Sequence, residues 1–157
     1  MENDHSSQIG DNMDYTSTLP FVKAFMTGLA VGIADTMLCL AFNLLWRKDG
    51  AIGFFSSDII NVSSIIFGTN ILFIIIGVLY FGFLKAEVKG EVLFSVIFAA
   101  LTVWGVIAAA HVHRTPDPVQ NGRFHVLLIG VILIFGISAS VGMPILYHNK
   151  KFGQLIL

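Results

Sequence analysis

Four long apolar stretches constrain the fold of this chain more than any other feature. A helix needs roughly 20 mostly apolar residues to cross the hydrocarbon core of a bilayer. The chain offers four such stretches, at about residues 21–46, 60–84, 92–110 and 125–147. Because a backbone in lipid must satisfy its own hydrogen bonds, each stretch predicts a helix. We therefore expect an all-α integral membrane protein with four transmembrane helices in an antiparallel bundle.

The composition supports a lipid environment. Hydrophobic residues make up 55% of the 157 residues and charged residues only 12%, about half the usual share in soluble domains. The net charge of -1 gives no reason to expect nucleic acid as a partner. The expected partners are the lipid bilayer and, beyond it, other membrane subunits or a second copy of the chain. We expect no cofactor.

The polar ends of the chain frame a single membrane domain. Residues 1–20 are polar and acidic, without Lys or Arg, which predicts a disordered tail rather than a signal peptide. The predicted four-helix domain covers residues 21–147, and residues 148–157 form a short C-terminal tail. Four spans place both termini on one side, and the Lys and Arg residues divide between the two sides as follows. The side of the termini carries five lysines: Lys23, Lys85, Lys89, Lys150 and Lys151. The other side carries Arg47, Lys48, Arg114 and Arg123. The positive-inside rule then predicts cytoplasmic termini.

The first span carries a stripe of small and polar residues with an aspartate beside it. Gly28 and Gly32 form a GxxxG pair, and the stripe continues at helical spacing through Thr36, Cys39 and Asn43. Small residues let membrane helices approach closely, and polar side chains bond across the contact. The flanking Asp35 is therefore predicted to face the protein interior.

The depth of Asp35 makes it a candidate functional residue. It lies roughly 21 Å along an ideal helix from Phe21, near the middle of a core about 30 Å thick. A charge at that depth costs about 2.5–3.5 kcal/mol on insertion scales. No Lys or Arg lies at similar depth in the other spans, so we expect a neutral or hydrogen-bonded carboxyl. The polar residues at comparable depth are Thr69, Asn70, Thr102 and Ser138.

The other spans also carry packing signals. Asn70 and Gly77 lie seven residues apart in the second span, and Gly136 and Ser140 form a small-xxx-small pair in the fourth. Pro144 is predicted to kink or end the fourth helix near its last turn.

The polar segment 111–125 offers a second candidate site. His111, His113, His125 and Asp117 are suitable ligands for zinc or another divalent ion. Residues two apart on a helix diverge by roughly 200°, so His111 and His113 chelate together only where the third helix has ended. Histidines also suit a membrane interface without any metal. The same segment carries Arg114 and Arg123, which could bind an anionic headgroup or a quinone carbonyl.

Three functions are consistent with these observations. The leading one is a non-enzymatic membrane subunit or scaffold, because packing stripes occur in every span and no phosphate loop, nucleophile elbow, dinucleotide fingerprint or HExxH motif is present. The second is a small proton- or cation-coupled transporter or channel built on Asp35, Thr36, Asn43 and Asn70. The third is a metal- or quinone-binding membrane protein that uses the segment 111–125. The missing motifs favour a protein that is not an enzyme.

Overall fold

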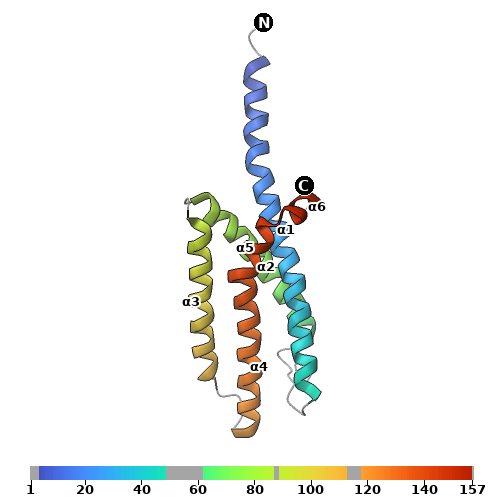
Figure 1. Ribbon diagram of the computed structural model, residues 1–157, viewed down its shortest axis with the longest axis vertical. Coiled ribbons are helices and arrows are strands. Elements are labelled where there is room, and N and C mark those ends of the chain that lie inside the picture. The colour runs from blue at the N-terminus through green and yellow to red at the C-terminus, as the bar shows by residue number, and fades with distance from the viewer. Residues whose placement is uncertain (1–3, 49–61, 87–88, 113–117, 157) are drawn as a thin grey trace.

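A computed structural model describes the backbone of residues 4–48, 62–86, 89–112 and 118–156, and these parts of the chain are helical without strands. The elements are α1 (Asp4–Lys48), α2 (Val62–Ala86), α3 (Gly90–Ala110), α4 (Pro118–Ile137), the π-helical turn η2 (Ser138–Gly142), α5 (Met143–His148) and α6 (Lys150–Ile156). Figure 1 shows α1 as the longest helix, with its N-terminal part projecting beyond the others.

The all-helical prediction is confirmed for the described residues. Four helical stretches within them are long and apolar enough to cross a membrane: Leu19–Trp46, Ile65–Ala86, Gly90–Ala110 and Phe124–His148. These stretches coincide with the four expected spans to within a few residues at most ends. Helices of this length and composition suggest an integral membrane protein in contact with lipid.

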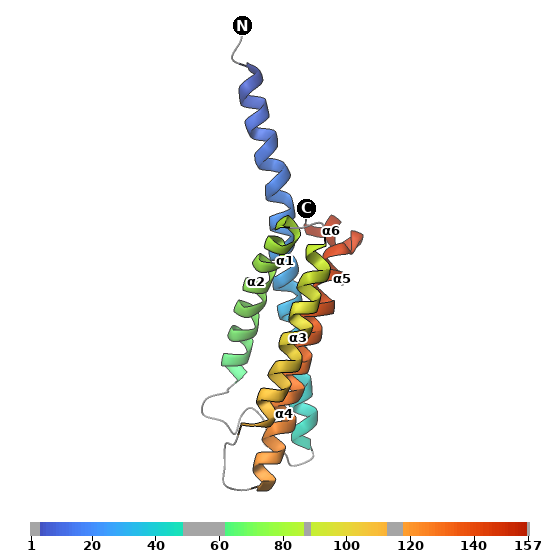
Figure 2. The ribbon, with the colours of Figure 1, turned by 90° about the vertical axis from the view of Figure 1, so that its left-hand side faces the viewer.

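The two predicted tails contain helical backbone. α1 begins at Asp4 and passes through Pro20, and α6 lies within the segment 148–157. The part of α1 before Pro20 stands clear of the other helices in both views (Figures 1 and 2). An isolated helix of that length is marginal in water because tertiary packing supplies most helical stability. The disorder expected for residues 1–20 therefore stays a prediction.

Glycine allows α1 and α2 to approach until their backbones touch. A Cβ atom built on Gly28 would lie 2.4 Å from the carbonyl oxygen of Phe73 and 3.1 Å from the Cα atom of Gly77. A Cβ atom on Gly77 would in turn lie 2.8 Å from the carbonyl oxygen of Ala24. The two helices share the most extensive contact among the elements. This crossing sets the height at which the polar residues of α1 and α2 meet.

A second close approach joins α3 to α4. A Cβ atom on Gly136 would lie 2.0 Å from Oγ1 and 2.6 Å from Cβ of Thr102. Gly130 gives room to a side chain of α1, because a Cβ atom there would lie 2.4 Å from the ring of Phe42. The long helices thus pack as α1 with α2, α3 with α4, α2 with α3, and α1 with α4.

The buried apolar side chains form two clusters, one on each side of Asp35 along α1. The larger cluster consists of Ala24, Val31, Phe73, Ile76, Tyr80, Phe94, Ala139 and Met143. The smaller cluster consists of Cys39, Ile65 and Leu127, with Phe42 and Trp46 packed against it. We call the two regions the Tyr80 end and the Trp46 end. Asp35 lies between them along α1.

Candidate functional site

The carboxyl of Asp35 is fully buried, in the middle part of the apolar stretch Leu19–Trp46 of α1. The residue is 0% exposed, and it lies about 24 Å from Leu19 and about 16 Å from Trp46 along an ideal helix. Its Oδ2 atom accepts a long hydrogen bond of 3.7 Å from the thiol of Cys39, one turn later. The hydroxyl of Ser138 also interacts with the carboxyl. Among the described residues, Oδ1 has no hydrogen-bond partner.

The residue beside this carboxyl, Ser138, begins a π-helical turn. The N–H group of Met143 donates to the carbonyl of Ser138, five residues earlier, in place of the usual four. Pro144 follows directly and has no N–H group to continue an α-helical ladder. The predicted kink near Pro144 therefore takes the form of a widened turn between α4 and α5. Such π-bulges occur frequently at functional sites.

Asn70 of α2 bonds to Thr36 rather than to Asp35. Its Nδ2 atom donates to Oγ1 of Thr36 at 3.2 Å and to the carbonyl of Ile66 at 2.7 Å. The hydroxyl of Thr36 donates to the carbonyl of Gly32 at 2.8 Å. The hydrogen bond from Asn70 to Thr36 thus joins α2 to α1 at the residue next to Asp35. It lies at the level where Gly32 lets α1 come close to α2.

The other polar residues at similar depth take different positions. Thr69 is buried and its hydroxyl has no hydrogen-bond partner among the described residues. Thr102 donates to the carbonyl of Phe98 at 2.7 Å and packs on Gly136. Asn43 is 2% exposed, two turns beyond Asp35 on the same side of α1. Of the four polar residues expected near the carboxyl, Ser138 alone is seen to interact with it.

The histidine segment lies partly outside the described residues. His113, Arg114 and Asp117 fall there, as does the side chain of Arg123. His111 places Nδ1 2.8 Å from the carbonyl oxygen of Ile107, and Nε2 of His125 contacts the carbonyl oxygen of Val112. No group of three His, Cys, Asp or Glu side chains suited to a metal occurs among the described residues. Metal or headgroup binding by the segment 111–125 therefore stays a prediction.

One polar cluster was missed by reasoning from the sequence. At the Tyr80 end, Nδ1 of His148 lies 3.3 Å from Oε1 of Glu91, and Nζ of Lys23 lies 4.7 Å above the ring of Tyr147. The ring of Tyr147 meets that of Tyr80 edge-on at 5.2 Å. Glu91 is half-buried in this cluster. The five residues come from α1, α2, α3 and α5, so no local spacing in the sequence unites them.

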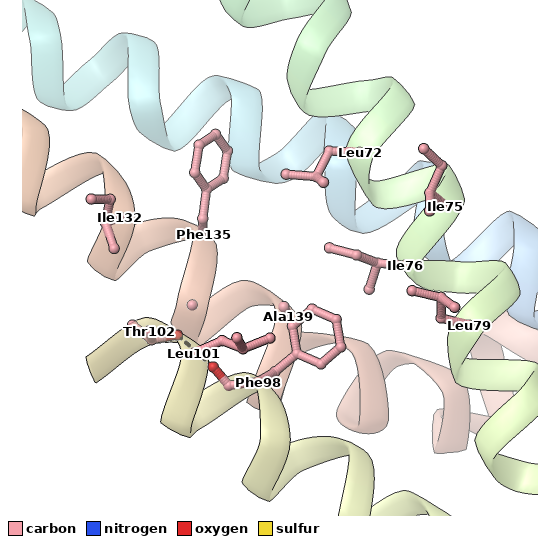
Figure 3. A pocket seen from close by; sticks show the side chains of 11 residues that line it. Leu72, Ile75, Ile76, Leu79, Phe98, Leu101, Thr102, Ile132, Phe135 and Ala139 are labelled. Carbon is pink, nitrogen blue, oxygen red and sulfur yellow. Dashed lines mark hydrogen bonds between the residues drawn. The ribbon is translucent and has the colours of Figure 1, made fainter. Parts of the chain in front are cut away.

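An apolar groove opens between α2, α3 and α4, with a volume of about 270 Å³. In Figure 3, Leu72, Ile76 and Leu79 of α2 face Phe98 and Leu101 of α3 across it. The hydroxyl of Thr102, a polar group in the lining, is already bonded to the backbone of Phe98. The groove offers apolar contact and little else.

Comparison with protein-family models, with curated proteins and with solved structures finds no match for this chain.

Proposed function

We propose that the chain crosses the membrane as an antiparallel four-helix bundle and that Asp35 binds and releases a proton during transport. The supporting observation is the carboxyl itself, which is fully buried at mid-span with one oxygen lacking a hydrogen-bond partner among the described residues. The ion pair found within the described parts of the chain joins other residues, His148 and Glu91. Ionisable residues inside transmembrane segments are rare and usually functional.

A purely structural role would not require a carboxyl here. The amide of Asn70 and the hydroxyl of Thr36 already hold α1 to α2 by an uncharged hydrogen bond. An aspartate adds about 2.5–3.5 kcal/mol of insertion cost whenever it is charged. The hydrogen bond from the Cys39 thiol to the carboxyl offsets little of this insertion cost, because it is long. We therefore rank proton transport above the scaffold function that the sequence alone favours.

The surroundings of Asp35 suit a proton better than a metal cation. Hard cations such as Ca²⁺ and Mg²⁺ take about six or more oxygen ligands. Among the described residues, the side chains seen to interact with the carboxyl are the hydroxyl of Ser138 and the thiol of Cys39. A proton needs a single oxygen, and Oδ1 offers one. On release, the neutral acid becomes a carboxylate and the proton passes to water.

The test is proton flux in proteoliposomes loaded with a pH-sensitive dye and driven by an imposed potential. Asp35→Asn keeps the shape of the side chain but cannot release a proton, so we expect flux to fall about 100-fold or more, in line with the roughly 10²–10⁴-fold contribution of a positioned proton-transfer group. Asp35→Glu should retain part of the flux. Thr27→Val is the matched control, because Thr27 is buried on the same helix and its hydroxyl donates to the Lys23 carbonyl at 2.7 Å, one turn earlier. Wild-type flux in Asp35→Asn would exclude this function.

A membrane subunit remains the second candidate, and the exposure of α3 favours it. The buried residues of α3 are Gly90, Phe94 and Ala109, whereas Trp104 is 69% exposed. The apolar groove of Figure 3 lies at the same helix. Native mass spectrometry after gentle extraction from the source membrane tests this function. A stable mass that includes other chains is expected for a subunit, and a lone monomer would count against it.

A further inference from the structure

We infer that the groove between α2, α3 and α4 binds one acyl chain of a membrane phospholipid, which enters between α2 and α3 from the leaflet at the Trp46 end. A lipid in this groove presupposes the proposed crossing of the membrane and does not depend on proton release by Asp35. The partner of the groove is then a single bound lipid, distinct from the surrounding bilayer and from a second polypeptide.

The lining of the groove suits an apolar occupant and offers nothing to water. Its side chains are aliphatic or aromatic except that of Thr102, whose hydroxyl donates to the Phe98 carbonyl at 2.7 Å. Apolar cavities stay dry, because a buried water needs about two to four polar partners. An empty groove would forfeit the dispersion contacts of its walls, whereas protein interiors are otherwise close-packed. Hydrocarbon is the occupant that meets both conditions.

The groove is open on the side that faces away from the core. Ile76 inside it is only 5% exposed, whereas Ile75 of α2 and Leu101 of α3 are 51% and 52% exposed. Figure 3 shows α2 on one side of the groove and α3 on the other, with Phe135 of α4 beside them. A chain that enters between α2 and α3 therefore contacts three helices, and van der Waals contacts of this kind drive association within lipid.

The groove lies at the depth of the lipid chains. Along an ideal helix, Leu72 is about 10 Å from Ile65, where the second apolar span begins, and Leu79 is about 10 Å from its end at Ala86. The hydrocarbon core is about 30 Å thick, so each leaflet contributes about half of it. An acyl chain from either leaflet reaches the groove.

The contact between α2 and α3 decides which leaflet has access. At the Tyr80 end, a Cβ atom on Gly90 would collide with the carbonyl oxygen of Phe83, and the ring of Phe94 meets those of Tyr80 and Phe83 edge-on at 4.9 and 5.8 Å. Below this contact, α2 slants away from α3 toward α1 in Figure 1. The space between the two helices is closed at the Tyr80 end and widens toward the Trp46 end.

The size of the groove favours a lipid chain over a helix of another polypeptide. A helix with its side chains is about 10–12 Å wide, so a single turn with a rise of about 5.4 Å occupies at least about 400 Å³. The groove has a volume of about 270 Å³. A second polypeptide would therefore fill it only with individual side chains, whereas an acyl chain can lie along its length.

Photo-crosslinking tests the site. The full-length protein is reconstituted with a phosphatidylcholine that carries a diazirine at the middle of one acyl chain. It is then extracted in mild detergent and irradiated, so that retained lipid reacts, and the labelled residues are located by mass spectrometry. We expect label on Leu72, Ile75 and Leu101 at least about tenfold above that on Val103, which is 61% exposed but outside the lining. A tenfold preference corresponds to about 1.4 kcal/mol.

A second lipid, with the diazirine next to the glycerol, tests the direction of entry. We expect its label at the Trp46 end of the two helices, on residues 65–69 of α2 and 105–110 of α3. Label on residues 82–86 and 90–94 in their place would show entry from the other leaflet and overturn the assigned direction.

Two substitutions test the groove from opposite sides. Leu101→Trp narrows it from α3 and Leu72→Trp narrows it from α2, so each should lower the label on Ile75 about tenfold as the preference is lost. Val103→Trp is the matched control, because it adds the same side chain to α3 outside the lining and should leave the label unchanged. The buried thiol of Cys39 shows that each variant is folded if it stays unreactive toward a maleimide before heating.

The remaining outcomes overturn the inference in distinguishable ways. Equal label on the groove residues and on Val103 after extraction would mean that only surrounding lipid contacts the protein. A stable dimer whose groove takes no label would assign the groove to a second copy of the chain. Irradiation of the intact vesicles should also label Val103, and no label there would contradict the membrane crossing itself. Proton flux in Asp35→Asn is a separate measurement, so transport can fail while the lipid site stands.

Discussion

Gly28→Ala and Gly77→Ala variants will each lower the free energy of unfolding by about 2–3 kcal/mol, at the upper end of the range for overpacked interiors. The new methyl group at Gly28 would lie 2.4 Å from the Phe73 carbonyl oxygen, and the one at Gly77 would lie 2.8 Å from the Ala24 carbonyl oxygen. Both obstacles are backbone atoms, which cannot rotate away as a side chain can. The helices must therefore separate along their whole contact to admit one carbon.

The buried thiol of Cys39 reports this loss directly. A maleimide dye that fluoresces on reaction with the thiol, followed during heating in detergent, gives the temperature at which the site opens. Gly82→Ala is the matched control, because it lies on the same helix as Gly77 and a Cβ atom there meets nothing within 4 Å. If Gly77→Ala unfolds at the same temperature as Gly82→Ala, the close approach of α1 and α2 is contradicted.

The second large effect is expected at Gly136. A methyl group there would lie 2.0 Å from Oγ1 and 2.6 Å from Cβ of Thr102. Rotating the Thr102 side chain moves Oγ1 but leaves Cβ in place, so α3 must move away from α4. Gly136→Ala should therefore cost about 1–3 kcal/mol. Gly142→Ala should cost far less, since its nearest neighbour, Val31 Cγ1, is 3.8 Å away.

A second substitution makes the Gly136 prediction specific. Thr102→Gly removes every atom of the Thr102 side chain that obstructs the new methyl group. The double variant should be more stable than the sum of the two single effects by about 0.5–3 kcal/mol, the range seen for residues in contact. Additive losses in the same thermal thiol assay would mean that Thr102 and Gly136 do not meet.

These packing positions also support the candidate site. Gly32 lies where α2 passes α1 at Asn70, and a Cβ atom on Gly32 would be 3.3 Å from Asn70 Oδ1. The hydrogen bond from Asn70 to Thr36 depends on that approach. A variant that spreads α1 from α2 is therefore expected to disturb the surroundings of Asp35 as well as the stability.

Reasoning from the sequence anticipated the helices because their cause is local. A run of about 20 apolar residues in lipid has no alternative that satisfies its backbone. The inward position of Asp35 also follows from one helix, because residues three and four apart share a face. The Gly28 and Gly32 pair and the Gly136 position were indicated by the same periodicity.

The sequence did not predict which residues of different helices contact one another. Asn70, Thr69, Thr102 and Ser138 were equally eligible neighbours of the carboxyl, since the sequence shows depth but not the rotation and height of one helix against another. Contacts such as the Gly77 crossing and the pair of Glu91 with His148 join residues far apart in the chain.

The sequence by itself determined that this chain forms four apolar helices and carries one carboxylate at the middle of the first. Both results depend on residue type and on periods within one helix. The tertiary structure decided which side chains meet that carboxylate. It also gathered the buried apolar side chains into two clusters, one around Val31 and Met143 and one around Cys39 and Leu127. The physical reason is that close packing at a few glycines sets the register between helices, and register is a property of pairs of helices rather than of any one of them.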